Sequence, residues 1–195
     1  MKPIFHTYSG QSIHLGKIRP EDVNIVDIAR SLSMTCRFGG HCSQFYSVAQ
    51  HSVMCSLLVH PMLAGIALLH DAAEAYIGDV ITPLKRNIRL IRRWERQAEH
   101  AISKRFFWYK EASVFSYPSI FNDFHKEIKD ADKIALFVEA SSVSKSKVDF
   151  LNIDLSAVKH CRDNTNVIPL LPVHAEKEFM DRFEELSKEG MIDGH

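Results

Sequence analysis

The stretch Ala67–Asp79, ALLHDAAEAYIGD, combines imidazole and carboxylate side chains within an apolar segment. On a helix, His70, Asp71 and Glu74 share a polar side, while the alanines and leucines face the core. An imidazole beside a carboxylate is costly to bury unless a metal ion or another partner binds both. The stretch therefore predicts a site whose remaining groups lie elsewhere in the chain.

Two further groups stand on the segments expected to pack beside this one. His51 lies in SVAQHSV, and Asp132 lies in KDADKIALF, early in a later helix. Two histidines and two carboxylates suit a borderline divalent ion such as Zn²⁺, Mn²⁺, Co²⁺ or Fe²⁺ rather than Ca²⁺. We expect one such ion to be bound by His51, His70, Asp71 and Asp132.

The same region offers groups for proton transfer and for binding phosphate. Glu74 follows His70 by one helical turn, where a general base for a metal-bound water would stand. Asp79 could orient a ligand or protonate a leaving oxygen. Arg37 and Lys85 supply cations for phosphate oxygens. This chemistry requires no serine or cysteine nucleophile, because the ion activates water.

Each of these groups also has a structural interpretation. His70 and Asp71 could form a hydrogen-bonded pair without any ion, and Asp132 could cap a helix or pair with a neighbouring lysine. Arg37 could be a surface side chain. The basic run Lys85–Arg93 is typical of a solvated helix face.

Hydrophobic periodicity predicts the elements that hold these groups, and the expected fold class is all-α. Ser9-Gly10 separates two short alternating segments, which fits a short N-terminal β-hairpin. Residues 108–118 read as an irregular connection, and NVIPLLP as extended chain. The expected helices are one opened by Pro20 and ending near Thr35, one capped by Ser47 and ending before His60-Pro61, one over Met62–Tyr76 that Gly78 ends, one or two over residues 82–106, one over Ile120–Ser144 and one over Ala175–Lys188.

Composition places the chain among ordinary soluble proteins. It has 195 residues, 46% hydrophobic and 25% charged, with 24 basic and 24 acidic side chains. We expect one domain over residues 1–195, no nucleic-acid partner, no membrane span and no signal peptide. The four cysteines form no CxxC pair, so we expect reduced, buried thiols that fill the core of a cytoplasmic protein.

The order His51, His70-Asp71, Asp132 resembles the H…HD…D pattern of the HD-domain metal-dependent phosphohydrolases. HDAAEAYIGD followed by TPLK is similar to the corresponding segment of the bacterial 5′-deoxynucleotidases in that superfamily, and also to phage HD-domain triphosphohydrolases that act on dATP. The resemblance covers most of Arg37–Val138 and implies an all-α HD bundle that forms a homodimer or a higher homo-oligomer.

The resemblance also implies roles for individual residues. His51, His70, Asp71 and Asp132 match the ligands of one divalent metal, and Glu74 and Asp79 match the acids that act on the attacking water. The substrate contacts implied are Arg37, Phe38, Pro83 and Lys85. Phe38 stands where the characterised nucleotidases have Trp, and Gly40 leaves more room near the base, so base selectivity does not transfer.

We therefore expect a phosphohydrolase of 2′-deoxynucleoside 5′-phosphates, which releases phosphate by attack of metal-bound water. The alternatives are a dNTP triphosphohydrolase, above all of dATP, and a non-catalytic nucleotide-binding HD protein. A cyclic-nucleotide or alarmone hydrolase would use the same metal ligands but has less support, because alarmone hydrolases carry a different acidic pair after the HD. The small-molecule partner in the lead and alternative interpretations is a nucleotide.

Overall fold

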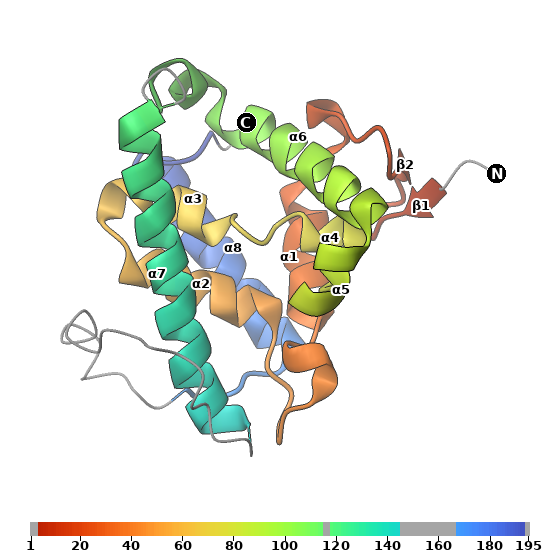
Figure 1. Cartoon of the computed structure of the whole chain (residues 1–195), viewed down its shortest axis with the longest axis vertical. Helices are drawn as coiled ribbons and strands as arrows, with labels where there is room; N and C mark the ends of the chain where they lie inside the picture. The colour runs from red at the N-terminus through yellow and green to blue at the C-terminus, as the bar shows by residue number, and fades with distance from the viewer. Residues whose placement is uncertain (1–3, 115–117, 145–166, 194–195) are drawn as a thin grey trace.

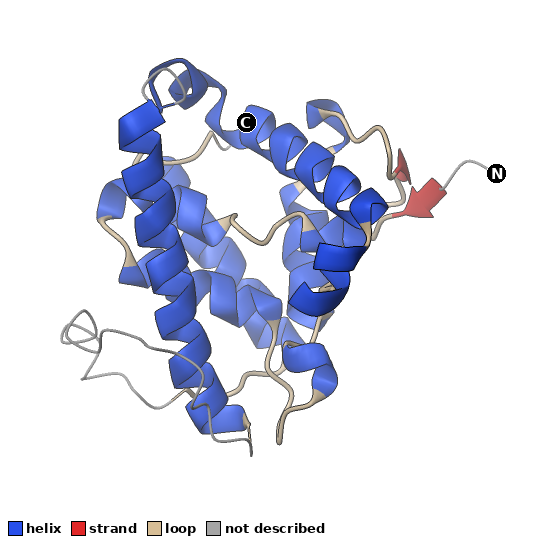
Figure 2. Ribbon diagram, in the orientation of Figure 1, coloured by secondary structure: helices blue, strands red, loops and turns tan. Residues whose placement is uncertain are grey.

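The computed structural model describes residues 4–114, 118–144 and 167–193, and it is helical apart from one hairpin (Figures 1 and 2). The expected all-α class with a short N-terminal hairpin is confirmed. In chain order the elements are β1 (Ile4–His6), β2 (Ser12–His14), the 3₁₀ turn η1 (Pro20–Asp22), α1 (Ile25–Met34), η2 (Phe38–Gly40), α2 (Val48–Leu58), η3 (Pro61–Leu63), α3 (Ala64–Leu68), α4 (Glu74–Ile77), α5 (Thr82–Asn87), α6 (Arg89–Val114), α7 (Pro118–Val143) and α8 (Pro172–Lys188).

The long helices α6 and α7 lie on opposite sides of the view in Figure 1, with α2, α3 and α4 between them. Helix α2 is central because it packs against α1, α3, α7 and α8, and α4 packs against α1 and α6. The core between these helices contains fully buried apolar side chains, among them Ile28, Leu32, Val48, Leu68 and Phe179. This packing brings α2, the α3–α4 connection and α7 together around the predicted site.

Side-chain caps fix where two of the helices begin. Ser47 accepts a hydrogen bond from the Gln50 backbone N–H, as predicted for the start of α2. Pro20 was expected to open the first helix of the chain, but it begins only the short turn η1. Helix α1 starts later because the side chain of Asn24 accepts the N–H of Val26 and so caps that position.

The helix predicted over Met62–Tyr76 is interrupted, and that prediction was wrong. Helix α3 ends at Leu68, residues 69–73 form turns, and α4 begins at Glu74. His70 accounts for the break, since its Nδ1 lies 2.7 Å from the Ala67 carbonyl oxygen and competes for that acceptor. Gly78 ends α4 as predicted, with a φ of 88° that favours glycine.

The remaining expectations fall on the later helices. The basic segment forms the two helices α5 and α6, which Ile88 separates, and α7 and α8 lie close to their predicted bounds. The irregular connection expected over residues 108–118 was wrong as far as Val114, because α6 continues there beyond a kink at Phe107. No helix in the described parts of the chain is both long and apolar enough to cross a membrane.

Candidate metal centre

Three neighbouring elements bring the predicted ligands together. His51 comes from α2, His70 and Asp71 from the turn after α3, and Asp132 from α7. The His51 Nε2 atom lies 3.2 Å from Asp132 Oδ1 and 3.5 Å from Asp71 Oδ2, and His70 Nε2 lies 3.2 Å from the same Asp71 oxygen. The imidazole rings are 5.2 Å apart. Four side chains thus point ligand atoms at one small volume.

His70 carries a buried ring nitrogen that the described part of the protein leaves unsatisfied. Its Nδ1 donates to the Ala67 carbonyl oxygen at 2.7 Å, which puts the proton on Nδ1 and the lone pair on Nε2. Nε2 is buried and has no hydrogen-bond partner among the described residues. Because Nε2 lies 3.2 Å from the Asp71 carboxylate, a bare lone pair would be repelled there, and the nitrogen needs a cation, which is either a proton or a metal ion.

His51 is fixed by a carboxylate that the sequence analysis did not single out. Its Nδ1 lies 2.8 Å from Glu139 Oε1, and both side chains are 0% exposed. Glu139 also forms an ion pair with Arg37, with Nε 3.0 Å from Oε2. A carboxylate that accepts the Nδ1–H of a histidine fixes the tautomer and leaves Nε2 free to bind a metal ion.

The electrostatics of the centre favour positive charge at the two Nε2 atoms. Burial alone would lower the pKa of His70, but the Asp71 carboxylate outweighs it and raises the pKa to about 9. Burial opposes charge on His51 as well, and Glu139 still raises the pKa of that imidazole well above its ordinary value. The pKa of Asp71 falls, because the two imidazoles outweigh its burial. The centre is therefore built to hold a cation.

Cys55 adds a third kind of donor, a thiol, to the imidazoles and carboxylates of this group. It is fully buried on α2, and its Sγ lies 3.5 Å from His51 Nε2. Ligand atoms of His51, Cys55, His70 and Asp132 all lie within 4.8 Å of one another, so this group could hold a metal ion. The prediction of a buried thiol was right for Cys55, although its position beside His51 was not anticipated. It was wrong for Cys36 and Cys42, which lie at a surface turn and are partly exposed.

The residues present could hold a metal ion. The test is the orphaned, buried Nε2 of His70, which converges with a second imidazole nitrogen and two carboxylates. Nitrogen and oxygen donors, with or without a thiolate, suit borderline ions such as Zn²⁺, Co²⁺ or Fe²⁺. The structure thus supports metal binding at this place and leaves the identity of the ion open.

Glu74 lies at the start of α4 as a largely buried acid. Burial, followed by the nearby charge of Asp71, raises its pKa to about 7, although Lys85 acts in the opposite direction. Lys85 Nζ lies 3.0 Å from Glu74 Oε1 and 2.6 Å from Glu95 Oε1. The ammonium predicted to bind substrate phosphate is therefore already paired with two protein carboxylates. Asp79 is partly buried and adds to the field that raises the pKa of Glu74.

Arg37 is buried among acids rather than extended toward solvent. Its side chain is 13% exposed, and besides Glu139 it faces Asp71, with Nη1 3.9 Å from Oδ2. Burial opposes charge on Arg37, but the carboxylates of Glu139 and Asp71 outweigh it and raise the guanidinium pKa. The Phe38 ring lies under this guanidinium, 5.6 Å from it. Arg37 thus links the turn η2 to the metal centre.

The two segments predicted to contact substrate lie next to each other. Gly39 and Gly40 of η2 are exposed and have positive φ angles of 58° and 80°. A β-carbon at Gly39 would lie 3.8 Å from Ile81 Cγ2, directly before α5, which carries exposed Pro83 in its first turn. The turn with Phe38 and Gly40 therefore borders the segment that leads into Pro83 and Lys85.

Glu139 is the residue that sequence reasoning missed. It follows Asp132 by two helical turns, so both lie on the same face of α7, and its neighbours in FVEA are apolar. A carboxylate on the buried face of an amphipathic helix was the available signal. Its role is to hold His51 and not to bind an ion, so the spacing of metal ligands does not reveal it.

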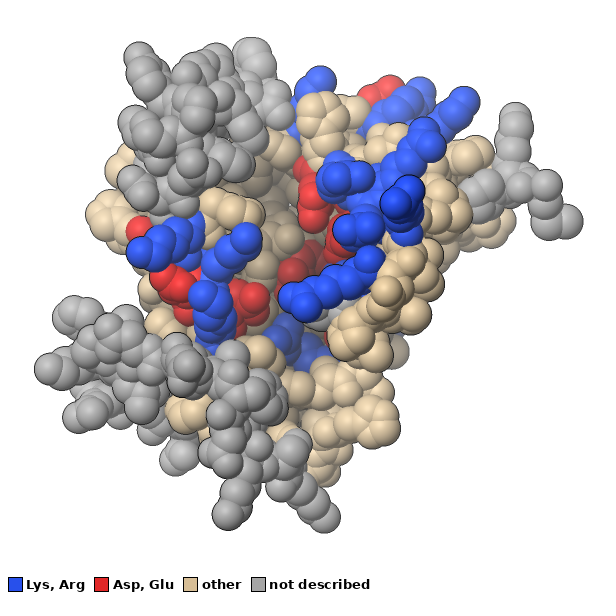
Figure 3. All heavy atoms as spheres, in the orientation of Figure 1, with Lys and Arg blue, Asp and Glu red and all other residues tan. Residues whose placement is uncertain are grey.

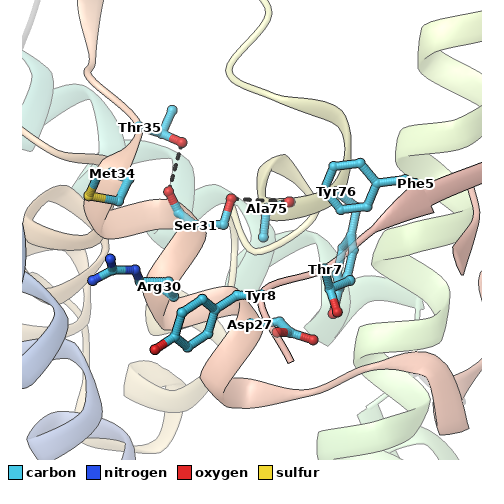
Figure 4. Close-up of a pocket in the computed structure, with 10 residues that line it drawn as sticks. All are labelled: Phe5, Thr7, Tyr8, Asp27, Arg30, Ser31, Met34, Thr35, Ala75 and Tyr76. Carbon is cyan, nitrogen blue, oxygen red and sulfur yellow. Dashed lines mark hydrogen bonds between the residues drawn. The ribbon is translucent and has the colours of Figure 1, made fainter. Parts of the chain in front are cut away.

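A cavity of about 260 Å³ lies away from this centre, between the N-terminal hairpin and α1 (Figure 4). Its buried carboxylate, Asp27, accepts hydrogen bonds from Ser9 N at 2.6 Å and Ser9 Oγ at 2.8 Å. Arg30 pairs with Glu176 at 3.0 Å and stacks on the ring of Tyr8. These charged side chains already have protein partners, so they do not mark a ligand site.

Comparison with known proteins finds relatives in bacteria. The chain is 41% identical over 182 residues to a protein of Escherichia coli strain K12 whose name is uncharacterized protein YfdR, and the match covers 93% of this chain and 94% of that protein. An uncharacterized protein of Rhodobacter capsulatus is 39% identical over 89 residues, which cover 41% of this chain and 45% of the relative. No protein-family model matches the chain. Neither relative's name states an activity.

Proposed function

This chain belongs to the protein family of Escherichia coli YfdR, and we propose that it is a divalent-metal-dependent phosphohydrolase of 2′-deoxynucleoside 5′-phosphates. The observation that carries the proposal is the convergence of His51, His70, Asp71 and Asp132 beside the buried acid Glu74. The resemblance to the HD-domain phosphohydrolases supplies the substrate class. The donor set supplies the expectation of a metal, since a binding site for nucleotide alone needs no orphaned imidazole nitrogen.

The residues that would hold the ion are His51, His70, Asp71 and Asp132, and Cys55 is within reach as a further donor. When bound, a divalent ion lowers the pKa of a coordinated water and offsets the charge of a phosphate group. The protein's own task is to keep both Nε2 lone pairs facing that ion. Glu139 does this for His51, and the Ala67 carbonyl oxygen does it for His70.

Glu74 is the proposed proton acceptor. With a pKa of about 7 it is partly ionised at neutral pH, so it can take a proton from the attacking water and release it again. Lys85 holds the carboxylate in place and limits the rise of its pKa. Asp79 follows the Gly78 turn close to Glu74, where it could assist the leaving oxygen, as the resemblance implies.

The charge on the surface suits an anionic substrate. In Figure 3, acidic atoms line a hollow between α7 and the α5–α6 helices, and lysine and arginine side chains border it on both sides. Helix α6 carries Arg89, Arg92 and Arg93, which are exposed and form no ion pair among the described residues. A metal at the acidic floor together with cations at the rim would attract phosphate oxygens.

This border of cations also favours a second candidate function, the hydrolysis of a dNTP to nucleoside and tripolyphosphate. A triphosphate carries more charge than a monophosphate and extends further, so it could reach the arginines on α6. The two functions share the metal centre, Glu74 and attack at the α-phosphorus with the nucleoside O5′ as the leaving oxygen. They differ in whether the site must also hold the β- and γ-phosphates.

A nucleotide panel tests the proposal. The protein, loaded with Co²⁺, Mn²⁺ or Zn²⁺, is incubated with dAMP and with dATP, and the released phosphates are separated. Orthophosphate from dAMP supports the lead function, and tripolyphosphate from dATP supports the second. Binding of nucleotide without turnover would identify a non-catalytic member. If no deoxynucleotide is bound or cleaved with any of the three ions, the nucleotide assignment is wrong.

A further inference from the structure

Two partly exposed cysteines face each other across the turn η2. The sulfur atoms of Cys36 and Cys42 are 3.5 Å apart, in mutual contact, and both residues are free thiols. The turn between them contains Arg37 and Phe38 and the paired glycines. A disulfide bond is about 2.05 Å long, so the two sulfur atoms would have to approach each other by roughly 1.5 Å.

The backbone on both sides holds the two thiols in this arrangement. Cys36 forms an isolated β-bridge with Ser47, and Arg37 N donates to Tyr46 O at 2.8 Å. On the other side, Ser43 donates to the Val143 carbonyl oxygen of α7 from its backbone N at 2.6 Å and from its Oγ at 2.9 Å. These contacts hold the backbone beside both cysteines, on either side of the turn.

The intervening turn can absorb the small movement that a bond requires. Phe38, Gly39 and Gly40 all have positive φ angles, and the two glycines can change their φ angles at little cost in conformational energy. Gly40 has no atom within 4 Å of the place where a β-carbon would stand, so the turn is not packed tightly there. In contrast, Cys55 is fully buried, so a small oxidant in solution has no direct access to it.

We propose that Cys36 and Cys42 form an oxidation site, a dithiol that hydrogen peroxide converts into an intramolecular disulfide. Cys36 Sγ attacks a peroxide oxygen, the O–O bond breaks, and a sulfenic acid and one water form. Cys42 Sγ then attacks the Cys36 sulfur, the S–O bond breaks, and a second water leaves. The two sulfurs together lose two electrons, and the peroxide gains them.

The order of the two steps follows from the environment of Cys42. Burial and the contact with Cys36 raise the pKa of the Cys42 thiol, so it is the poorer first nucleophile. The resulting ring would tie Arg37 and Phe38 into a closed loop beside Ile81. Exposed disulfides of this kind are open to reduction by other thiols, so the modification is reversible.

Mass spectrometry of the intact, full-length chain tests the proposal without any substrate or metal, so it can succeed even if the proposed function fails. The native protein is treated with hydrogen peroxide, its free thiols are alkylated, and it is digested without reduction. We expect the four titratable thiols to fall to two and the chain to lose two hydrogen atoms in mass. Cleavage after Arg37 separates Cys36 from Cys42, and cleavage after Tyr46 separates Cys42 from Cys55, so the linked peptides identify the pair.

Matched variants complete the test. Cys36→Ser and Cys42→Ser should each abolish the linked peptides, and Cys161→Ser should leave them unchanged. The mapping of the parent protein alone remains decisive if a variant folds poorly. A link to Cys55 or Cys161, a link between two chains, or separate over-oxidation of both thiols without a bond would overturn the proposal, as would four unmodified thiols.

Discussion

The metal centre and the cavity beside the hairpin both contain buried charge, but they satisfy it differently. In the cavity, Asp27 has its donors from Ser9, and Arg30 has its partner Glu176. In the centre, imidazole lone pairs and carboxylates converge, and His70 Nε2 has no hydrogen-bond partner among the described residues. Charges that are already paired hold a fold together, whereas imidazole and carboxylate groups that converge on one point form a site for a cation.

The largest expected difference between the metal centre and the cavity is in how a substitution at each changes the rate of turnover. Glu74→Gln removes the proton acceptor and should lower kcat by about 10²- to 10⁴-fold, while the metal content stays at the parent value. Phosphate release under saturating nucleotide measures it. The matched control is Glu176→Gln, which changes the partner of the cavity residue Arg30 and should leave turnover at the parent rate. A Glu74→Gln variant with nearly full activity would remove Glu74 from the mechanism.

The next effect concerns metal affinity. Glu139→Gln removes the charge behind His51 and should weaken metal binding by about 10- to 100-fold, because the imidazole becomes less basic and less well held. Isothermal titration of the metal-free protein measures it, with circular dichroism to verify folding. Glu127→Gln on the same helix, whose carboxylate accepts the His60 N–H, is the control and should bind metal normally. Equal affinities in the two variants would contradict the role of Glu139.

The pH dependence of the reaction should follow Glu74. The carboxyl group is protonated below its pKa of about 7, so kcat/KM should rise with pH through that region as the base form appears. Lys85→Met removes a nearby positive charge that lowers this pKa, and should move the rising limb upward by about one pH unit. Arg86→Met, an exposed neighbour, should leave the limb in place. A limb that does not respond to Lys85→Met belongs to another group.

The smallest effect belongs to the cavity. Asp27→Asn weakens the two hydrogen bonds from Ser9 and should cost about 1 kcal/mol of unfolding free energy. Metal affinity should not change, because the side chain takes no part in the centre. Urea denaturation and metal titration of one preparation measure both quantities. A large loss of metal binding would show that the two regions are coupled.

The sequence was sufficient to predict which side chains cluster at the candidate centre because their signal is local. The adjacent His70 and Asp71, and polar groups on the otherwise apolar faces of His51 and Asp132, are readable from the pattern. The structure brings these four residues together. The helical class and the cap at Ser47 were readable for the same reason.

The rest depended on contacts between distant parts of the chain. The pairing of Lys85 with Glu74 and of Arg37 with Glu139 joins residues from different elements, so no local pattern reports it. The break after Leu68 arises because the His70 side chain takes a backbone acceptor that periodicity assigns to the helix. Sequence reasoning therefore predicted the cluster of His51, His70, Asp71 and Asp132, and it missed the carboxylates that pair with Lys85 and Arg37.

The most direct test of the account is the number of Co²⁺ ions bound per chain, measured by equilibrium dialysis of the metal-free protein and of its His70→Ala variant. We expect one ion per parent chain, and loss of that binding in the variant, because the Nε2 atom of His70 is gone. Parent protein that binds no ion, or a variant that binds as tightly as the parent, would contradict a metal centre at His51, His70, Asp71 and Asp132.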